Sequence, residues 1–322
     1  MNPLVTIITP AYNRADYLAA TIESVLAQDY APLEYIVLDD GSQDHTREVL
    51  ARYSGRIIWD SHPNMGETRT VNKGWQQARG EFVAVVNSDD PLLAGAVQTA
   101  VDFMIAHPEV LVAYPDWDKI GPRGELIERV QVPEYNYRYM LTRHHCIVGP
   151  GAFIRRRAFE LAGLRDPEFR YVADFEYWLR LGLYGPFARI PASLATFRVH
   201  SQSASVSHAG RAMAAEHIRL MRKYYARPDL PAEVRQVRAE AWGWAHHVAA
   251  EMCGRDRFAA ALHYLKAVWC HPPILWVLGR NQLLRALKRL PPPLYALLRW
   301  SGRRAQAAGR QLAHAVRPRQ DI

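Results

Sequence analysis

The 322-residue sequence has few cysteines and no long apolar run. Its three cysteines, Cys146, Cys253 and Cys270, are odd in number, and no two of them have the spacing of a CxxC pair or a zinc site. No run reaches about 18 apolar residues, and the first residues, MNPLVTIITPAYNR, lack the basic-then-apolar order of a signal peptide. These absences exclude a disulfide scaffold and predict a reduced, cytoplasmic protein without a spanning helix.

Three nucleotide and metal motifs are also missing. The sequence contains no GxGxxG, no GxxxxGK[ST] and no HExxH, so a dinucleotide-binding fold, a P-loop and a zinc protease have no local support.

Acidic residues are scarce near the C-terminus. Of the 40 basic and 32 acidic residues, ten and one respectively fall in 279–322, which leaves 30 and 31 in the first 278 residues. The basic character therefore belongs to a tail. This charge distribution argues against a nucleic-acid groove across the main body and for an anionic partner of the tail.

The first half of the sequence alternates short apolar segments with amphipathic ones. The expected strands are Val5–Thr9, Tyr35–Leu38, Ile57–Trp59, Phe82–Val86 and Val110–Tyr114. The expected helices between them are Ala15–Gln28, His45–Tyr53, Thr68–Ala78 and Gly95–Ala106. This alternation predicts an α/β fold, a Rossmann-like and mostly parallel sheet with helices on both faces.

The pattern changes towards the C-terminus. Residues 116–200 suggest short strands and two helices, and the sequence is almost entirely helical after Ser207. We place a domain boundary there, with an α/β domain over 1–207 and a helical C-terminal region over 208–322. The last part of that region, 279–322, is a basic amphipathic tail.

Polar segments follow three of the expected strands: PAYNR after the first, DDGS after the second and NSDD after the fourth. Ligands of parallel sheets bind beyond the carboxyl ends of the strands, so the three segments are expected on one edge. Each Asp pair could instead form a plain turn, because Asp, Gly and Pro favour turns. Together on one edge, the carboxylates fit a divalent cation such as Mg²⁺ or Mn²⁺ better, since such ions take oxygen ligands.

Three longer stretches carry a family resemblance. VTIITPAYNRADYLAATIESVLAQDY, YIVLDDGSQDHT and NMGETRTVNKGWQQARGEFVAVVNSDD resemble the inverting family-2 glycosyltransferases of the GT-A fold. The resemblance covers roughly residues 4 to 205 and implies a GT-A catalytic domain over 1–207. It also implies a nucleoside-diphosphate-sugar donor, with UDP the usual carrier, and a glycan or lipid-linked acceptor in cell-surface polysaccharide synthesis.

The resemblance implies roles for individual residues. The residues implied for the nucleotide sugar are Thr9, Pro10, Ala11, Tyr12, Asp39, Asp40, Arg69, Asn87 and Ser88. The segment Asn87-Ser88-Asp89 matches the family's DxD motif, with Asn87 in place of the first Asp. Asp89 matches the ligand of a divalent cation, Mn²⁺ or Mg²⁺, and Asp90 follows it.

A second match concerns the catalytic base. VADFEYWLRL resembles the family's ED-x-x-x-W-x-R-L segment, in which Asp174 matches the base and Ala173 replaces the usual Glu. Asp174 could instead be a carboxylate that only favours the helix N-terminus. Glu176 is a reserve candidate for the base, and Trp178 is expected either in the core or against a sugar.

The closing stretch FRVH resembles the family's last active-site segment and makes His200 a second metal-ligand candidate, although a satisfied core histidine is the common alternative.

The basic, Leu-rich tail 279–322 also suits the inner face of an anionic membrane.

Two rival functions are considered. A nucleotidyltransferase also pairs carboxylates with a metal, but PAYNR does not resemble its phosphate loop. A non-catalytic nucleotide-sugar or glycan-binding member of the same fold is favoured by Asn87 and Ala173, whereas the retained Asp89 and Asp174 favour an enzyme.

Overall fold

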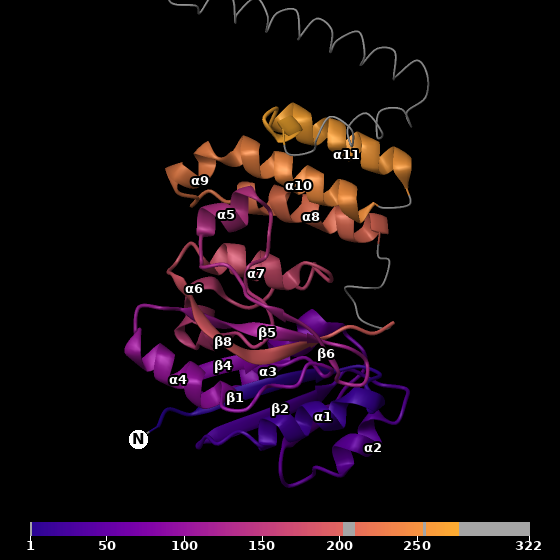
Figure 1. Cartoon of the computed structure of the whole chain (residues 1–322), viewed down its shortest axis with the longest axis vertical. Coiled ribbons are helices and arrows are strands. Elements are labelled where there is room, and N and C mark those ends of the chain that lie inside the picture. The colour runs from indigo at the N-terminus through magenta and orange to yellow at the C-terminus, as the bar shows by residue number, and fades with distance from the viewer. Residues whose placement is uncertain (1, 202–209, 254–255, 277–322) are drawn as a thin grey trace, which may run out of the picture. The chain divides into compact units, whose positions relative to one another are not determined.

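A computed structural model describes residues 2–201, 210–253 and 256–276 of the chain (Figure 1). The strands are β1 (Val5–Ala11), β2 (Leu33–Asp39), β3 (Ile58–Ser61), β4 (Phe82–Val85), β5 (Val112–Ile120), β6 (Leu126–Val130), β7 (Phe153–Arg155) and β8 (Phe187–Arg198). The helices are α1 (Ala15–Leu26), α2 (Thr46–Ala51), α3 (Glu67–Gln77), α4 (Ala96–Ala106), α5 (Tyr137–Thr142), α6 (Arg157–Ala162), α7 (Ala173–Leu181), α8 (Gly210–Tyr225), α9 (Ala232–Gln236), α10 (Arg238–Met252) and α11 (Arg257–Cys270).

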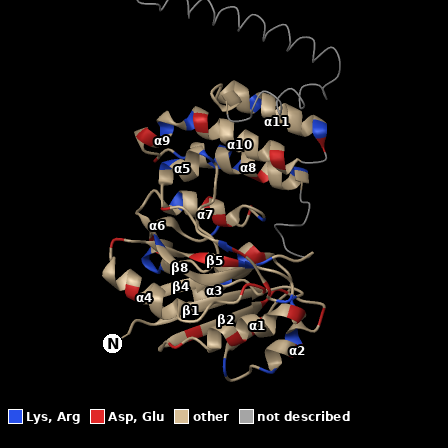
Figure 2. Cartoon of the chain, viewed as in Figure 1, with Lys and Arg blue, Asp and Glu red and all other residues tan. Residues whose placement is uncertain are grey.

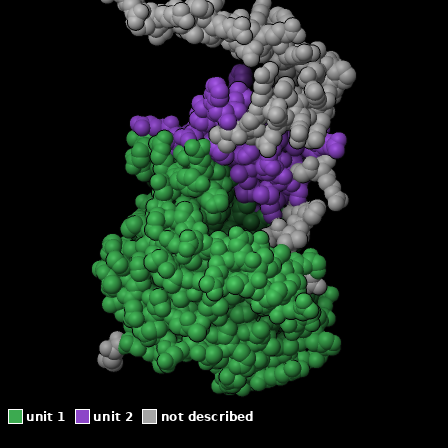
Figure 3. All heavy atoms as spheres, viewed as in Figure 1, with its two compact units in different colours: residues 1–209, 219–235 green, residues 210–218, 236–322 purple. Residues whose placement is uncertain are grey.

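The chain divides into two compact units (Figure 3). The first unit comprises residues 1–209 and 219–235, and the second comprises 210–218 and 236–322. The expected boundary at Ser207 and the expected tail 279–322 both lie outside the described residues, so they stay predictions. Acidic and basic residues are interspersed over the described elements (Figure 2), as the near balance of the first 278 residues suggests.

The first unit is built on one sheet with the strand order β3-β2-β1-β4-β7-β5-β6, and β8 also pairs with β5. The pairs β1–β2, β1–β4, β2–β3 and β5–β8 are parallel. The short strand β7 is antiparallel to β4 and β5, and β6 is antiparallel to β5. The expected α/β class is therefore confirmed, with a mixed sheet whose N-terminal half is parallel.

Helices cover both faces of the sheet because successive side chains of a strand point to opposite faces. Val5 and Ile7 of β1 belong to a core cluster with Leu18, Ile22 and Val25, which recur along one side of α1. The alternate residue Ile8 faces α3 instead. A Cβ on Gly74 would lie 2.5 Å from Ile8 Cγ2, so only glycine allows α3 to approach β1 this closely.

The strand β8 is longer than the sequence pattern suggests. It begins at Phe187 and runs for 12 residues, whereas only short strands were expected within 116–200. Its pairing with β5 continues from Val112–Phe187 to Ile120–Arg198 with two irregularities on the way. Pairing along the whole of β5 thus supplies hydrogen bonds to residues that show no strand pattern of their own.

The second unit is helical in its described part. Ala249 of α10 and Cys253, the residue after α10, pack with Ala259 of α11 and Ala214 of α8. Ala267 and Ile274 form a further cluster with Trp244 and Tyr264. No helix among the described residues is both long enough and apolar enough to cross a bilayer.

We expect the second unit to lose stability in mild acid because it buries neutral histidines. Burial lowers the pKa of His217 to about 4, and it lowers the pKa of His246 to about 4, helped by His263, whose Nδ1 lies 3.0 Å from His246 Nδ1. The unfolded chain binds protons near pH 6.5, so the stability due to these groups falls as pH drops from 6.5 towards 4. At pH 5 the loss reaches at most about 2 kcal/mol for each histidine.

Thermal unfolding followed by circular dichroism at 222 nm between pH 5 and 7.5 measures this effect. The double variant His217→Gln/His246→Gln should show a flatter pH dependence than the wild type. Equal pH dependence in both proteins would contradict the assignment.

Candidate active site

The polar segments after β1, β2 and β4 lie on one edge of the sheet, as predicted from the parallel pattern. In the parallel pairing Ala11 at the end of β1 stands opposite Asp39 at the end of β2, and Ile8 of β1 stands opposite Val85 at the end of β4. The carboxyl ends of these strands therefore carry all three segments.

The residues at the end of β1 and just after it differ in their exposure to solvent. Thr9, Pro10 and Ala11 are buried, and the hydroxyl of Thr9 hydrogen-bonds to Tyr35 Oη at 3.0 Å. Tyr12, in contrast, exposes 43% of its surface just beyond the strand. Of these four residues, Tyr12 is the one whose ring is open to a planar ligand.

The two carboxylates of DDGS already accept hydrogen bonds within the protein. Asp39 is fully buried and accepts from Ser42 N, from Arg47 Nε at 3.1 Å and from Ser61 Oγ at 2.6 Å. Asp40 accepts from Met65 N at 2.7 Å and from Gly66 N at 3.0 Å. These bonds fix the turns around the edge, including the turn that begins α3, on which Arg69 is exposed.

The adjacent carboxylates of NSDD point in different directions. Asp90 is buried, and it accepts from Arg198 N at 2.7 Å and from Asn87 Nδ2 at 2.9 Å. Burial and the neighbouring charge of Asp89 raise the pKa of Asp90 to about 7. Asn87 therefore holds Asp90 with its amide, and Ser88 is buried beside it.

Asp89 turns towards the segment that follows β8. Its Oδ2 atom accepts from His200 Nε2 at 2.9 Å and from Arg14 Nε at 3.2 Å. The side chain of Asp89 is 14% exposed, and that of His200 is 3% exposed. The structure thus brings together the two residues expected to bind a metal, which are 111 positions apart in the sequence.

The Asp89–His200 pair fits a divalent cation as part of a larger ligand set. An oxygen and an imidazole nitrogen that bind one Mn²⁺ ion at about 2.1 Å lie about 3 Å apart, which matches the observed separation. No group of three or more His, Cys, Asp or Glu able to hold a metal occurs among the described residues.

Asp174 and Glu176 lie in the first turn of α7 but differ in their surroundings. Asp174 is exposed, and its carboxylate accepts from Phe175 N. Both carboxylate oxygens of Glu176 accept from Arg180, at 2.7 and 2.8 Å. Trp178 is buried and packs against Tyr177 and Phe187 with edge-to-face geometry. Of these side chains, Asp174 alone is open to a substrate.

Sequence reasoning missed three residues at this edge. Arg14 pairs with Asp89, Arg198 donates from Nε to Asp89 O at 2.8 Å, and Glu67 begins α3 beside the same edge. Burial raises the pKa of Glu67, and the negative charges of Asp174 and Asp89 raise it further. All three occur inside the motifs quoted above, but an arginine or a glutamate at these positions does not by itself indicate a role in the site.

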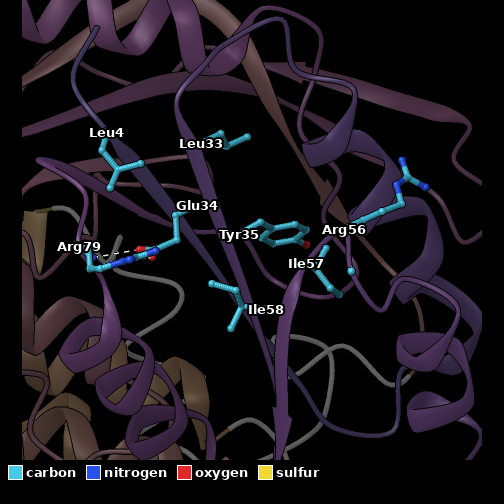
Figure 4. Close-up of a pocket in the computed structure, with 9 residues that line it drawn as sticks. Leu4, Leu33, Glu34, Tyr35, Arg56, Ile57, Ile58 and Arg79 are labelled. Atoms are coloured by element: carbon cyan, nitrogen blue, oxygen red, sulfur yellow. Dashed lines mark hydrogen bonds and ion pairs between the residues drawn. The ribbon is translucent and has the colours of Figure 1, made fainter. Parts of the chain in front are cut away.

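A pocket of about 270 Å³ lies at the opposite, amino-terminal end of β1, β2 and β3 (Figure 4). Its one acid, Glu34, accepts from Arg79 Nε at 2.6 Å, from Arg79 N at 3.0 Å and from Thr6 Oγ1 at 2.6 Å. Because this carboxylate is already saturated, the pocket offers little polar chemistry for catalysis.

The chain matches known glycosyltransferases. The sequence model of glycosyl transferase family 2 matches residues 6–162. TuaG of Bacillus subtilis, named for teichuronic acid biosynthesis, is 37% identical over 185 residues, which cover 56% of this chain and 72% of TuaG. An uncharacterized glycosyltransferase of Rickettsia typhi is 27% identical over 187 residues, covering 56% of this chain and 58% of that protein.

Other relatives are much longer. The hyaluronan synthase of Pasteurella multocida is 27% identical over 215 residues, which cover 65% of this chain but 22% of the synthase. The chain thus matches less than two thirds of the length of the Rickettsia protein and of the synthase, and more than two thirds of the length of TuaG.

Solved structures share the fold. TarS of S. aureus superposes with a TM-score of 0.62 at 17% identity and covers 99% of this chain and 57% of TarS. A 1–349 piece of TarS with UDP-GlcNAc gives 0.54 at 17% identity, covering 86% of this chain and 92% of that piece. A mannosyltransferase from Pyrobaculum calidifontis with GDP-Man and Mn²⁺ gives 0.55 at 18% identity, covering 95% and 81%. The chain belongs to glycosyl transferase family 2, and its α/β sheet has the GT-A architecture.

We expect substitutions at Glu176 and Asp174 to separate a structural carboxylate from a functional one. Glu176→Gln leaves the Arg180 guanidinium, which is 15% exposed, without its counter-charge and should lower the free energy of unfolding by about 2–3 kcal/mol. Asp174→Asn should lower it by less than about 1 kcal/mol, because only a helix-terminus interaction is lost. Urea unfolding measures both values, and a larger loss for Asp174→Asn would contradict this division of roles.

Proposed function

We propose that the protein is a metal-dependent, inverting glycosyltransferase that moves a sugar from a nucleoside diphosphate to a hydroxyl group of a glycan or lipid-linked acceptor. UDP is the proposed carrier. The observation that carries the proposal is the 2.9 Å pairing of Asp89 with His200 on the strand edge. The exposed carboxylate of Asp174 supports it as well, because Asp174 lies in the first turn of α7 and the segment before α7 is bonded to α3 at the same edge, with Thr68 donating to Phe169 O at 2.8 Å.

The comparisons support the donor class and the biological setting. Structural neighbours were solved with UDP-GlcNAc and with GDP-Man and Mn²⁺. TuaG and the hyaluronan synthase carry names that refer to polysaccharide synthesis. These names support the proposal that this chain acts in cell-surface polysaccharide synthesis.

In the proposed mechanism the diphosphate lies beside Asp89, His200 and Arg14. A divalent cation held by Asp89 and His200 would stabilise the charge that grows on the diphosphate oxygens as they leave. Asp174 accepts the proton of the acceptor hydroxyl while that oxygen forms a bond to the anomeric carbon from the opposite face. The bond between this carbon and the diphosphate breaks in the same displacement, so the anomeric configuration inverts.

The nucleotide-binding part of the site is proposed from the strand-end loops. The exposed ring of Tyr12 would contact the nucleobase. Asp39 or Asp40 would accept a hydrogen bond from the edge of that base, through a carboxylate lone pair that no protein donor uses. Arg69 is exposed nearby on α3 and would contact the base or a phosphate. A non-catalytic nucleotide-sugar or glycan-binding protein is the alternative, and turnover separates the two.

We expect UDP to stabilise the purified protein only when Mn²⁺ is present. Binding at about 100 times the dissociation constant adds about 2.7 kcal/mol, which raises the melting temperature by several degrees. Asp89→Asn and His200→Ala should each abolish the metal-dependent part of this shift. The screen includes UDP, GDP, dTDP, CMP and ADP, and no response to any of them would contradict a nucleotide-sugar site.

Asp174→Asn is the matched variant for catalysis. It should bind UDP with Mn²⁺ as the wild type does, but it should lose at least about a hundredfold in transfer or hydrolysis of the sugar nucleotide, because the base is gone. Proton NMR of the released sugar would show inversion. Binding without any turnover in the wild type would favour the non-catalytic alternative.

We also propose that the C-terminal part contacts the inner face of an anionic membrane. Trp269 and Trp276 expose 88% and 91% of their surface at and after the end of α11. Tryptophan favours the interface between lipid and water, and the following residues 279–322 carry ten basic residues against one acid. Each basic side chain near an anionic surface adds about 1 kcal/mol.

Flotation with phosphatidylserine-containing vesicles at about 0.1 M salt measures this contact. The full chain should float, whereas a chain ending at Leu278 should float at least about tenfold less, and Trp269→Ser/Trp276→Ser should show a smaller loss. Vesicles of phosphatidylcholine alone are the control. Equal flotation of all three proteins would contradict the role of the tail.

A further inference from the structure

One face of α1 lies against the NSDD segment. Arg14, which precedes the helix, pairs with Asp89 at 3.2 Å. Further along the helix, Thr21 donates from Oγ1 to the Ser88 carbonyl oxygen at 3.1 Å. Tyr17 comes three residues after Arg14 and four before Thr21. Because residues three or four apart share one face of a helix, Tyr17 belongs to the face of α1 that meets Asp89.

The half-buried ring of Tyr17 contacts two residues at the end of β8 and just after it. The centre of this ring lies 4.5 Å from the centre of the His200 imidazole, and the two planes are 37° apart. The Arg198 guanidinium lies 5.1 Å from the centre of the Tyr17 ring. The face of an aromatic ring attracts cations and packs well against another flat ring. Tyr17 therefore touches the imidazole that bonds to Asp89.

Hydrogen bonds fix the elements on both sides of this ring. The Arg198 guanidinium donates to Gly121 O at 3.1 Å and to Asp89 O at 2.8 Å. At the start of α1, Ala15 N donates to Asp44 Oδ2 at 3.1 Å. The aromatic ring thus extends from a fixed helix start and packs against a fixed guanidinium.

This arrangement restrains the imidazole of His200. A histidine side chain rotates about two bonds, and the 2.9 Å approach of Nε2 to Asp89 Oδ2 requires a particular setting of both. An aromatic ring packed against the imidazole opposes rotation away from that setting. We infer that Tyr17 is a positioning residue that keeps the imidazole of His200 turned towards Asp89.

The inference, which rests on the proposed function, concerns the choice of metal. Mg²⁺ prefers oxygen ligands, whereas an imidazole nitrogen binds transition ions such as Mn²⁺ more readily. An imidazole that is held in place therefore favours Mn²⁺ over Mg²⁺, and a loosely held one loses much of this preference. Residues that orient a metal ligand typically contribute about 10- to 100-fold to the metal affinity.

Isothermal titration of Mn²⁺ and of Mg²⁺ into the full chain saturated with UDP, and in parallel with GDP, measures this preference. Tyr17→Leu removes the ring but keeps an apolar side chain. It should weaken Mn²⁺ binding about tenfold and change Mg²⁺ binding by less than about twofold. Tyr17→Phe keeps the ring and should bind both ions as the wild type does.

Phe103→Leu is the matched control. Phe103 of α4 packs against His107 with the same ring separation, 4.5 Å, and with a similar angle of 39°. Its substitution should change neither affinity. A second control uses His200→Ala: in that background Tyr17→Leu should not change the ratio of Mn²⁺ to Mg²⁺ affinity any further, because the imidazole is already absent.

The possible failures of the inference and of the proposed function are distinguishable. An unchanged affinity ratio in Tyr17→Leu, or a wild type that binds both ions equally well, would overturn the inference while the proposed function stands. An equal loss in Tyr17→Phe would also overturn it, because the effect would then belong to the hydroxyl group. If neither ion binds the wild type together with a nucleotide, the proposed function fails and the inference with it. Retained binding of Mg²⁺ with the nucleotide shows that Tyr17→Leu is folded.

Discussion

The buried carboxyl of Asp90 joins two distant parts of the chain, and the geometry of the site depends on this junction. It accepts from the backbone of Arg198, 108 positions away, and the Arg198 side chain returns to Asp89 O. Neighbouring residues reinforce the contact, because Thr196 donates hydrogen bonds from its N and its Oγ1 to Pro91 O. Burying a carboxyl without such donors would cost several kcal/mol. The junction carries His200, two residues after Arg198, to the carboxylate of Asp89.

A second set of hydrogen bonds positions Asp174, the proposed base. Asp40 fixes the turn before α3, and Asn72 and Thr68 of α3 bond to the backbone of Arg165 and Phe169. This segment leads directly into α7, whose first turn contains Asp174. The Asp89–His200 pair is thus set by β4 and β8, and the position of Asp174 by α3 and α7.

The alternation of strands and helices allowed the parallel half of the sheet, its helices and its polar edge to be predicted, because each signal lies within a few neighbouring residues. The strand β7 and the first part of β8 escaped prediction, since β7 is a strand through its pairing with β4 and β5, and β8 through its pairing with β5. Spacing could not show that Asp89 and Asp90 diverge, or that Asn87 holds Asp90. Arg14 and Arg198 were missed for the same reason, because their hydrogen bonds to Asp89 are a property of the folded chain.

The charge balance of the site explains how carboxylates can gather there before any cation binds. Asp89 forms an ion pair with Arg14 and accepts a hydrogen bond from His200, and Arg165 and Arg14 offset the charge around Glu67. A divalent cation held by Asp89 and His200, as proposed, would add positive charge beside Arg14. That added charge is repulsive unless a diphosphate arrives with it. Metal and nucleotide should therefore bind cooperatively, which favours a site that assembles only with its anionic substrate.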